Sequence, residues 1–149
     1  MSEVIPIASD HAGFEMKQKL VERLRALGYD PQDLGTNSPA STDYADYAHP
    51  VASRVEHGEV KRGILLCGTG LGMSYAANRH PHVRAAVAWS PEIAELSRQH
   101  NDSNILVLPA RFVSEEDANS ILETWLKTPF EGGRHERRVE KIEPLPEST

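Results

Sequence analysis

Cysteine is almost absent from this chain, which has only Cys67 among its 149 residues. A single cysteine excludes an internal disulfide and is typical of a reducing compartment. No stretch approaches the ~20 consecutive apolar residues of a membrane-spanning helix. The N-terminal residues lack a basic segment followed by an apolar one, so no secretory signal is evident. We therefore expect a cytoplasmic protein with no membrane partner.

Basic residues are fewer than acidic ones, 16 Lys and Arg against 22 Asp and Glu, and the formal net charge is −6. This charge gives no support to nucleic-acid binding, although a local cluster of cations is still compatible with a small anionic ligand. Hydrophobic residues make up 39% of the chain and charged residues 26%, as in ordinary globular proteins. We expect one domain over residues 1–149, with a frayed tail at residues 143–149.

Apolar runs and helical patterns alternate along the chain. Strands are predicted at residues 4–8, 29–34, 63–66, 83–88 and 104–108, and helices at 14–27, 49–57, 73–79, 90–99, 114–127 and 134–142. Pro6 lacks a ladder donor and argues against a central place for the first strand. Pro50 is expected near the first turn of its helix. The alternation predicts a five-stranded parallel sheet in a three-layer α/β/α sandwich.

Cys67 ends the clearest strand and opens a loop with glycines at positions 68, 70 and 72. Alternate glycines let backbone N–H groups approach an anion closely, and the following helix adds positive potential. That potential favours a thiolate, which makes Cys67 a candidate nucleophile or base. Taken alone, a cysteine at a strand end is more often an inert core residue.

Other polar residues also follow predicted strands. Asp10 and His11 follow the first strand and Arg111 the last, so they should meet Cys67 at one edge of a parallel sheet. His100 and Asn101 end a helix and should lie at the opposite edge. They can join the same site only if they reach into a neighbouring subunit.

Competing motifs are weak. The loop is not G-x-G-x-x-G and does not follow the first strand, and no G-K-[ST] follows it, so dinucleotide and nucleoside-triphosphate sites are disfavoured. No arginine closely follows the cysteine, as a cysteine phosphatase would need. No metal-ligand cluster of typical spacing stands out.

Five separated motifs, within residues 4–142, resemble the family of B-type ribose-5-phosphate isomerases. They are SDHAGF at 9–14, GT at 35–36 with TDY at 42–44, CGTGLG at 67–72 with AAN at 76–78, LSRQHND at 96–102, and EGGRH at 131–135. The wider group includes galactose-6-phosphate and allose-6-phosphate isomerases. The resemblance implies a Rossmann-like fold, no cofactor and no metal, and a homodimer, in some members a tetramer, whose active sites are shared between subunits.

The resemblance also implies a role for each matching residue. Cys67 matches the base that moves a proton between C2 and C1, and Thr69 and His100 match the residues that assist ring opening. One branch of the family uses a later glutamate as base, but here that position is Met73. The matching substrate-binding positions are Asp10 and Asn101 for the sugar, Gly68, Thr69, Gly70, Leu71 and Gly72 for the enediolate, and His11, Arg111, Arg134 and Arg138 for the phosphate. Tyr44 is also expected to bind substrate, without a narrower role.

The leading hypothesis is therefore the interconversion of D-ribose 5-phosphate and D-ribulose 5-phosphate, a step of the pentose phosphate pathway. Two alternatives stay open at this point. One is an isomerase of a six-carbon sugar phosphate, such as allose or galactose 6-phosphate. The other is a sugar-phosphate-binding protein without catalysis.

Overall fold

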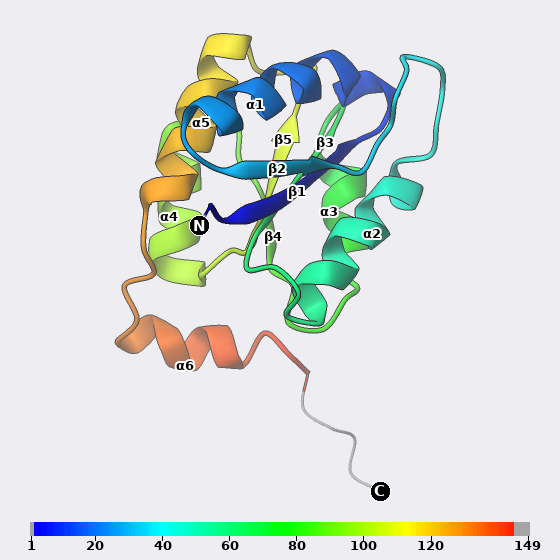
Figure 1. Ribbon diagram of the computed structural model, residues 1–149. Coiled ribbons are helices and arrows are strands. Elements are labelled where there is room, and N and C mark those ends of the chain that lie inside the picture. Colours follow the sequence, from blue (N-terminus) through cyan, green and yellow to red (C-terminus); the bar gives the residue numbers. More distant parts are fainter. Residues whose placement is uncertain (1, 145–149) are drawn as a thin grey trace, which may run out of the picture.

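The computed structural model describes residues 2–144, and its centre is a single parallel sheet with helices on both faces (Figure 1). The strand order is β2-β1-β3-β5-β4. The strands are β1 (Val4–Ser9), β2 (Asp30–Asp33), β3 (Gly63–Cys67), β4 (Ala85–Val87) and β5 (Ile105–Pro109). The predicted five-stranded parallel sheet is confirmed.

The helices form the two outer layers. They are α1 (Phe14–Ala26), α2 (Tyr44–Glu56), α3 (Leu71–Ala77), α4 (Pro91–Asn101), α5 (Glu115–Lys127) and α6 (Arg134–Glu140), with a short 3-10 helix, η1, at His11–Gly13. Helices α1, α4 and α5 pack on one face of the sheet, and α2 and α3 on the other (Figure 1). Alternate residues of β3 supply both cores, since Ile64 and Leu66 face the first group and Leu65 and Cys67 the second.

The strand order reverses between β1 and β3. From β1 the chain crosses to β2 on one side, and from β3 it continues to β4 and β5 on the other. Open α/β sheets bind ligands at the carboxyl ends of the strands beside such a reversal. Asp10 directly follows β1 and Cys67 ends β3, so these two residues flank this crevice.

Pro6 does not force β1 to an edge, and that prediction is wrong. β1 pairs with both β2 and β3. The Asp10 N–H donates to the Leu66 carbonyl across the β1–β3 pair, 3.2 Å away, so the Pro6 nitrogen also faces the β3 side. The β1–β3 pairing begins only at Ile7. The missing N–H therefore lies before the ladder and no bond is lost.

Helix starts were predicted well where a cap is present. Ser90 and Ser114 cap α4 and α5, and each hydroxyl accepts from a backbone N–H three residues on. The second helix was predicted too short, because α2 begins at Tyr44 and Pro50 lies in its interior. Pro50 lies on the exposed face of the helix. The opposite face packs on the sheet through the buried residues Ala48, Val51, Ala52 and Val55.

Both ends of the described chain lie away from the sheet's interior. No helix within residues 2–144 has the length and apolar character needed to cross a membrane. Of the predicted frayed tail, residues 145–149 lie outside the described part. Within it, the Glu143 carboxylate accepts a hydrogen bond of 2.6 Å from the His82 N–H.

Candidate active site

Cys67 lies at the end of the central strand β3, with 4% of its surface exposed. The loop after it turns at Gly70, whose φ of 79° suits glycine, and leads into α3. The Thr69 hydroxyl accepts from the Leu71 N–H at 3.2 Å. Within residues 2–144, the N–H groups of Gly68, Thr69 and Gly70 have no hydrogen-bond partner. These donors border the thiol and are available to a ligand.

Arg111 crosses this loop from β5. Its backbone N–H donates to the Gly68 carbonyl at 3.1 Å. A Cβ placed on Gly68 would lie 3.2 Å from both Cδ and Nη1 of Arg111. A side chain at position 68 would therefore crowd the guanidinium, which lies close to the loop. The prediction that Arg111 and Cys67 meet at one edge is confirmed.

Asp10 and His11 complete this edge from β1. The Asp10 carboxylate accepts from the N–H groups of Ala12 and Gly13, at 3.0 and 3.3 Å, and so caps η1. His11 exchanges two hydrogen bonds of 3.1 Å with Thr42: its N–H donates to Oγ1, and its Nδ1 accepts from the Thr42 N–H. Since Nδ1 accepts, the ring proton of neutral His11 is on Nε2. Sequence reasoning gave Thr42 no part in the site.

Tyr44 reaches the loop from the first turn of α2. A Cβ on Gly72 would lie 2.6–2.8 Å from three atoms of the Tyr44 ring. The ring thus covers the start of α3, and 44% of Tyr44 remains exposed. The predicted site residues of this edge, from β1, α2, β3 and β5, are brought together by the fold.

The other four predicted site residues lie elsewhere. α4 follows β4 and runs back along the sheet, so His100 and Asn101, at its end, lie at the amino edge of the strands. Arg134 and Arg138 belong to α6, which lies beyond that end of α4 (Figure 1). The Glu131 N–H donates to the Gln99 carbonyl at 3.1 Å, and this hydrogen bond links the segment before α6 to the last turn of α4. Within one chain, these four residues therefore lie at the opposite end of the sheet from Cys67.

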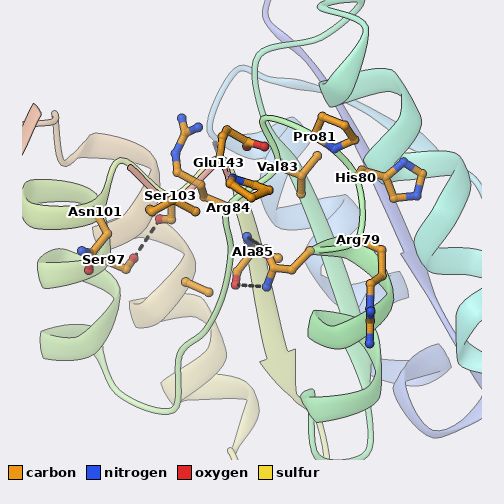
Figure 2. Close-up of a pocket in the computed structure, with 14 residues that line it drawn as sticks. Arg79, His80, Pro81, Val83, Arg84, Ala85, Ser97, Asn101, Ser103 and Glu143 are labelled. Atoms are coloured by element: carbon orange, nitrogen blue, oxygen red, sulfur yellow. Dashed lines mark hydrogen bonds between the residues drawn. The ribbon is translucent and has the colours of Figure 1, made fainter. Parts of the chain in front are cut away.

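A cavity of about 590 Å³ lies beside Asn101 at this second end (Figure 2). It is bounded by residues 78–86 after α3, by α4 and by residues 142–144. Figure 2 shows Asn101 and Ser97 on one wall and Arg79 and His80 on the other. None of the predicted residues around Cys67 lines this cavity.

One cluster escaped sequence inspection. His100, Glu131 and His135 offer ligand atoms that all lie within 4.8 Å of one another. The only sequence signal was the four-residue spacing of Glu131 and His135, and nothing linked them to His100. The sequence has no metal-ligand cluster of typical spacing, and these three residues come together only in the folded chain.

Comparison with known proteins gives one consistent result. The family model described as Ribose/Galactose Isomerase matches residues 5–142. The chain is 48% identical to ribose-5-phosphate isomerase B of Escherichia coli (strain K12), over 93% of both chains. It resembles the crystal structure of a ribose 5-phosphate isomerase from Thermotoga maritima (TM-score 0.94, 51% identity, 97% of this chain and 100% of that one). It also resembles ribose-5-phosphate isomerase B from Mycoplasma genitalium with bound ribulose-5-phosphate (TM-score 0.91, 44% identity, 95% of both chains).

Proposed function

This chain belongs to the ribose/galactose isomerase family, and we propose that it interconverts D-ribose 5-phosphate and D-ribulose 5-phosphate through a cis-enediolate. The observation that carries the proposal is the position of Cys67 at the strand-order reversal, beside a loop whose N–H donors have no partner among the described residues. The structural relative with bound ribulose-5-phosphate supports the choice of a five-carbon sugar.

In the proposed reaction, the Cys67 thiolate removes the C2 proton of the open-chain aldose and returns it to C1. A proton next to a carbonyl is acidic only when the developing oxyanion is stabilised. Fixed backbone donors contribute about 3 kcal/mol each to such stabilisation. The N–H groups of Gly68 and Gly70 supply them here. A well-placed base adds roughly 10²–10⁴-fold to the rate.

Ring opening comes before proton transfer, and we assign it to Thr69 and His100. The Thr69 oxygen already accepts from the Leu71 N–H, so its own proton is free to be donated to the sugar. His100 then serves as the proton acceptor or donor at the opposite side of the ring. Asp10, Tyr44 and Asn101 bind the sugar hydroxyls in this assignment.

The phosphate is assigned to His11, Arg111, Arg134 and Arg138. His11 offers its Nε2–H, because Nδ1 is occupied by the Thr42 N–H. Arginine binds two phosphate oxygens at once through its planar fork. Binding this non-reacting group holds C1 and C2 near the thiol.

A homodimer unites the two groups of residues. In a two-fold pair the carboxyl edge of one chain meets the amino edge of the other, and each site takes residues from both. The carboxyl edge carries large exposed apolar side chains, which a second copy would cover. They are Leu71, Tyr75, Trp89 and Phe112. The cavity beside Asn101 provides a concave surface at the other edge.

The proposed reaction is redox-neutral overall and uses no cofactor. We also take residues 1–149 as one isomerase domain, because the described helices and strands are arranged around a single sheet. Its thiol must stay reduced to act as a base, which supports a cytoplasmic location.

The purified protein, treated with a chelator, should convert ribose 5-phosphate to ribulose 5-phosphate and incorporate solvent deuterium into the sugar. Absence of both ketose and exchange would refute the proposal. Comparing kcat/KM with allose 6-phosphate and galactose 6-phosphate tests the choice of sugar, and a higher value for either would change the substrate but not the chemistry. Binding without turnover would indicate a non-catalytic protein.

A further inference from the structure

We propose that His100, Glu131 and His135 bind a divalent transition-metal ion of the zinc type, and that the bound ion inhibits the isomerase. The binding site stands on the geometry of this chain alone. The inhibition rests on the proposed function, because it requires His100 to act on the sugar.

The three side chains converge from three segments. His100 comes from the last turn of α4, Glu131 from the connection before α6, and His135 from the first turn of α6. The Glu131 carboxylate lies 3.5 Å from Nε2 of His135. The rings of His100 and His135 stack with centroids 4.4 Å apart and planes 13° apart. One ligand atom of each residue lies within 4.8 Å of the other two.

One of these separations is already close to that expected around a coordinated ion, whereas the set as a whole extends to 4.8 Å. Zinc binds imidazole nitrogen and carboxylate oxygen at about 2.1 Å, so tetrahedral ligand atoms lie roughly 3.4 Å apart. The Glu131–His135 pair already has this spacing. For all three residues to coordinate one ion, His100 must rotate out of its stack with the His135 ring. His100 is half-buried and so has more room to rotate than His135, which is only 7% exposed.

The chemistry of the ligands selects the class of ion. Two imidazoles and one carboxylate suit zinc, nickel, cobalt or copper, whereas magnesium and calcium prefer sites built from oxygen ligands. Among residues 2–144, the His100 side chain only stacks on the His135 ring, and the side chains of Glu131 and His135 form an ion pair only with each other. Three protein ligands leave a fourth position open to water.

A second histidine group shows the contrast. Nδ1 of His49 lies 2.7 Å from Nε2 of His80, and Nδ1 of His80 lies 2.8 Å from the Glu56 carboxylate. Both ring nitrogens of His80 are therefore engaged in a hydrogen-bonded chain. This group is no ready ligand set, and its variants serve as matched controls.

A bound ion would hold His100 at the metal and remove it from ring opening in the shared site. Inhibition should therefore follow occupancy of the cluster and be reversed by a chelator. Arg134 and Arg138 are not ligands in this arrangement.

The binding test titrates the full-length, metal-free protein with Co²⁺ and follows the visible absorption of tetrahedral cobalt. The Cys67→Ser variant serves as the reference protein, because it removes thiolate coordination. It should bind one Co²⁺ per chain, and Zn²⁺ should displace the cobalt. Adding Glu131→Gln or His135→Ala should weaken binding about tenfold or more, while adding His80→Ala should leave it unchanged. Binding that is lost in Cys67→Ser alone, or that is unaffected by both cluster variants, overturns the site.

The activity test uses protein with Cys67 intact. Zn²⁺ should inhibit it over the concentration range in which the cluster fills, and Glu131→Gln should stay active at Zn²⁺ levels that stop the parent. Full activity with the cluster occupied overturns the inhibition. A protein that binds Co²⁺ at the cluster but never isomerises ribose 5-phosphate refutes the proposed function and leaves the metal site standing.

Discussion

At the scale of single residues, Cys67 is the side chain on which the proposed reaction depends. Replacing it by serine changes one buried atom and substitutes a much weaker acid, which is a poor base at neutral pH. We expect Cys67→Ser to lower kcat for ribose 5-phosphate by roughly 10²–10⁴-fold, with KM little changed. Steady-state kinetics of Cys67→Ser and Cys67→Ala measure this. A raised KM with unchanged kcat would assign the thiol to binding instead.

Thr42 is a positioning residue for His11. Thr42→Val keeps the backbone N–H that donates to Nδ1 of His11. It removes the hydroxyl that accepts a hydrogen bond from the His11 backbone N–H. Loss of one such bond costs about 1 kcal/mol, so KM should rise about fivefold while kcat changes less. Thr42→Ser retains the hydroxyl and should restore KM. Equal kinetics for the serine and valine variants would remove Thr42 from the positioning of His11.

At the scale of elements, periodicity predicted the existence of every strand and every α-helix but not the order of the strands in the sheet, and caps located two helix starts. Periodicity failed where tertiary contacts decide. Tyr44 begins α2 a turn and a half before the predicted start because its ring packs over Gly72. Pro6 is accepted in a central strand because the pairing of β1 with β3 begins one residue later, at Ile7. Neither contact is visible before the chain is folded.

The packing of α2 on α3 gives a test at this scale. Gly72 has helical backbone, where alanine is intrinsically better by roughly 0.5–1 kcal/mol, yet its Cβ would enter the Tyr44 ring. We expect Gly72→Ala to displace Tyr44 and raise KM, with little change in thermal stability. The double variant Gly72→Ala/Tyr44→Ala relieves the clash and should be no worse than Tyr44→Ala alone. A Gly72→Ala protein with parental KM would show that Tyr44 does not contact substrate.

At the scale of the whole molecule, the candidate site residues form two groups, which lie at opposite ends of the sheet within one chain. The resemblance named its residues, and the sheet topology placed His100 and Asn101 opposite Cys67 before any coordinates. Three contacts are visible only in the folded structure: the hydrogen bonds between His11 and Thr42, the close approach of Arg111 to Gly68, and the stacking of His100 on His135. These contacts join segments whose separation in sequence carries no periodic signal.

The proposed sharing of the site between two subunits makes a quantitative prediction for mixed dimers. Cys67→Ser and His100→Ala should each be nearly inactive alone. In a mixed dimer, one site combines the intact Cys67 of one chain with the intact His100 of the other. Random exchange of subunits should restore about 25% of parental activity, since about half the dimers carry one good site of two. Activity assays after co-refolding measure this. No recovery in demonstrated mixed dimers would place the complete site within one chain.

The separation of the thiol from the α6 arginines has a consequence for assembly. In the proposed homodimer, a sugar phosphate held by both groups would span two chains, so it would bind the dimer and not the separated chains. By thermodynamic linkage, the ligand must then tighten the association of the subunits by as much as association improves its own binding. Under this proposal each bound substrate molecule would hold two polypeptides together, and we expect the dilute enzyme to be most completely dimeric when its substrate is abundant.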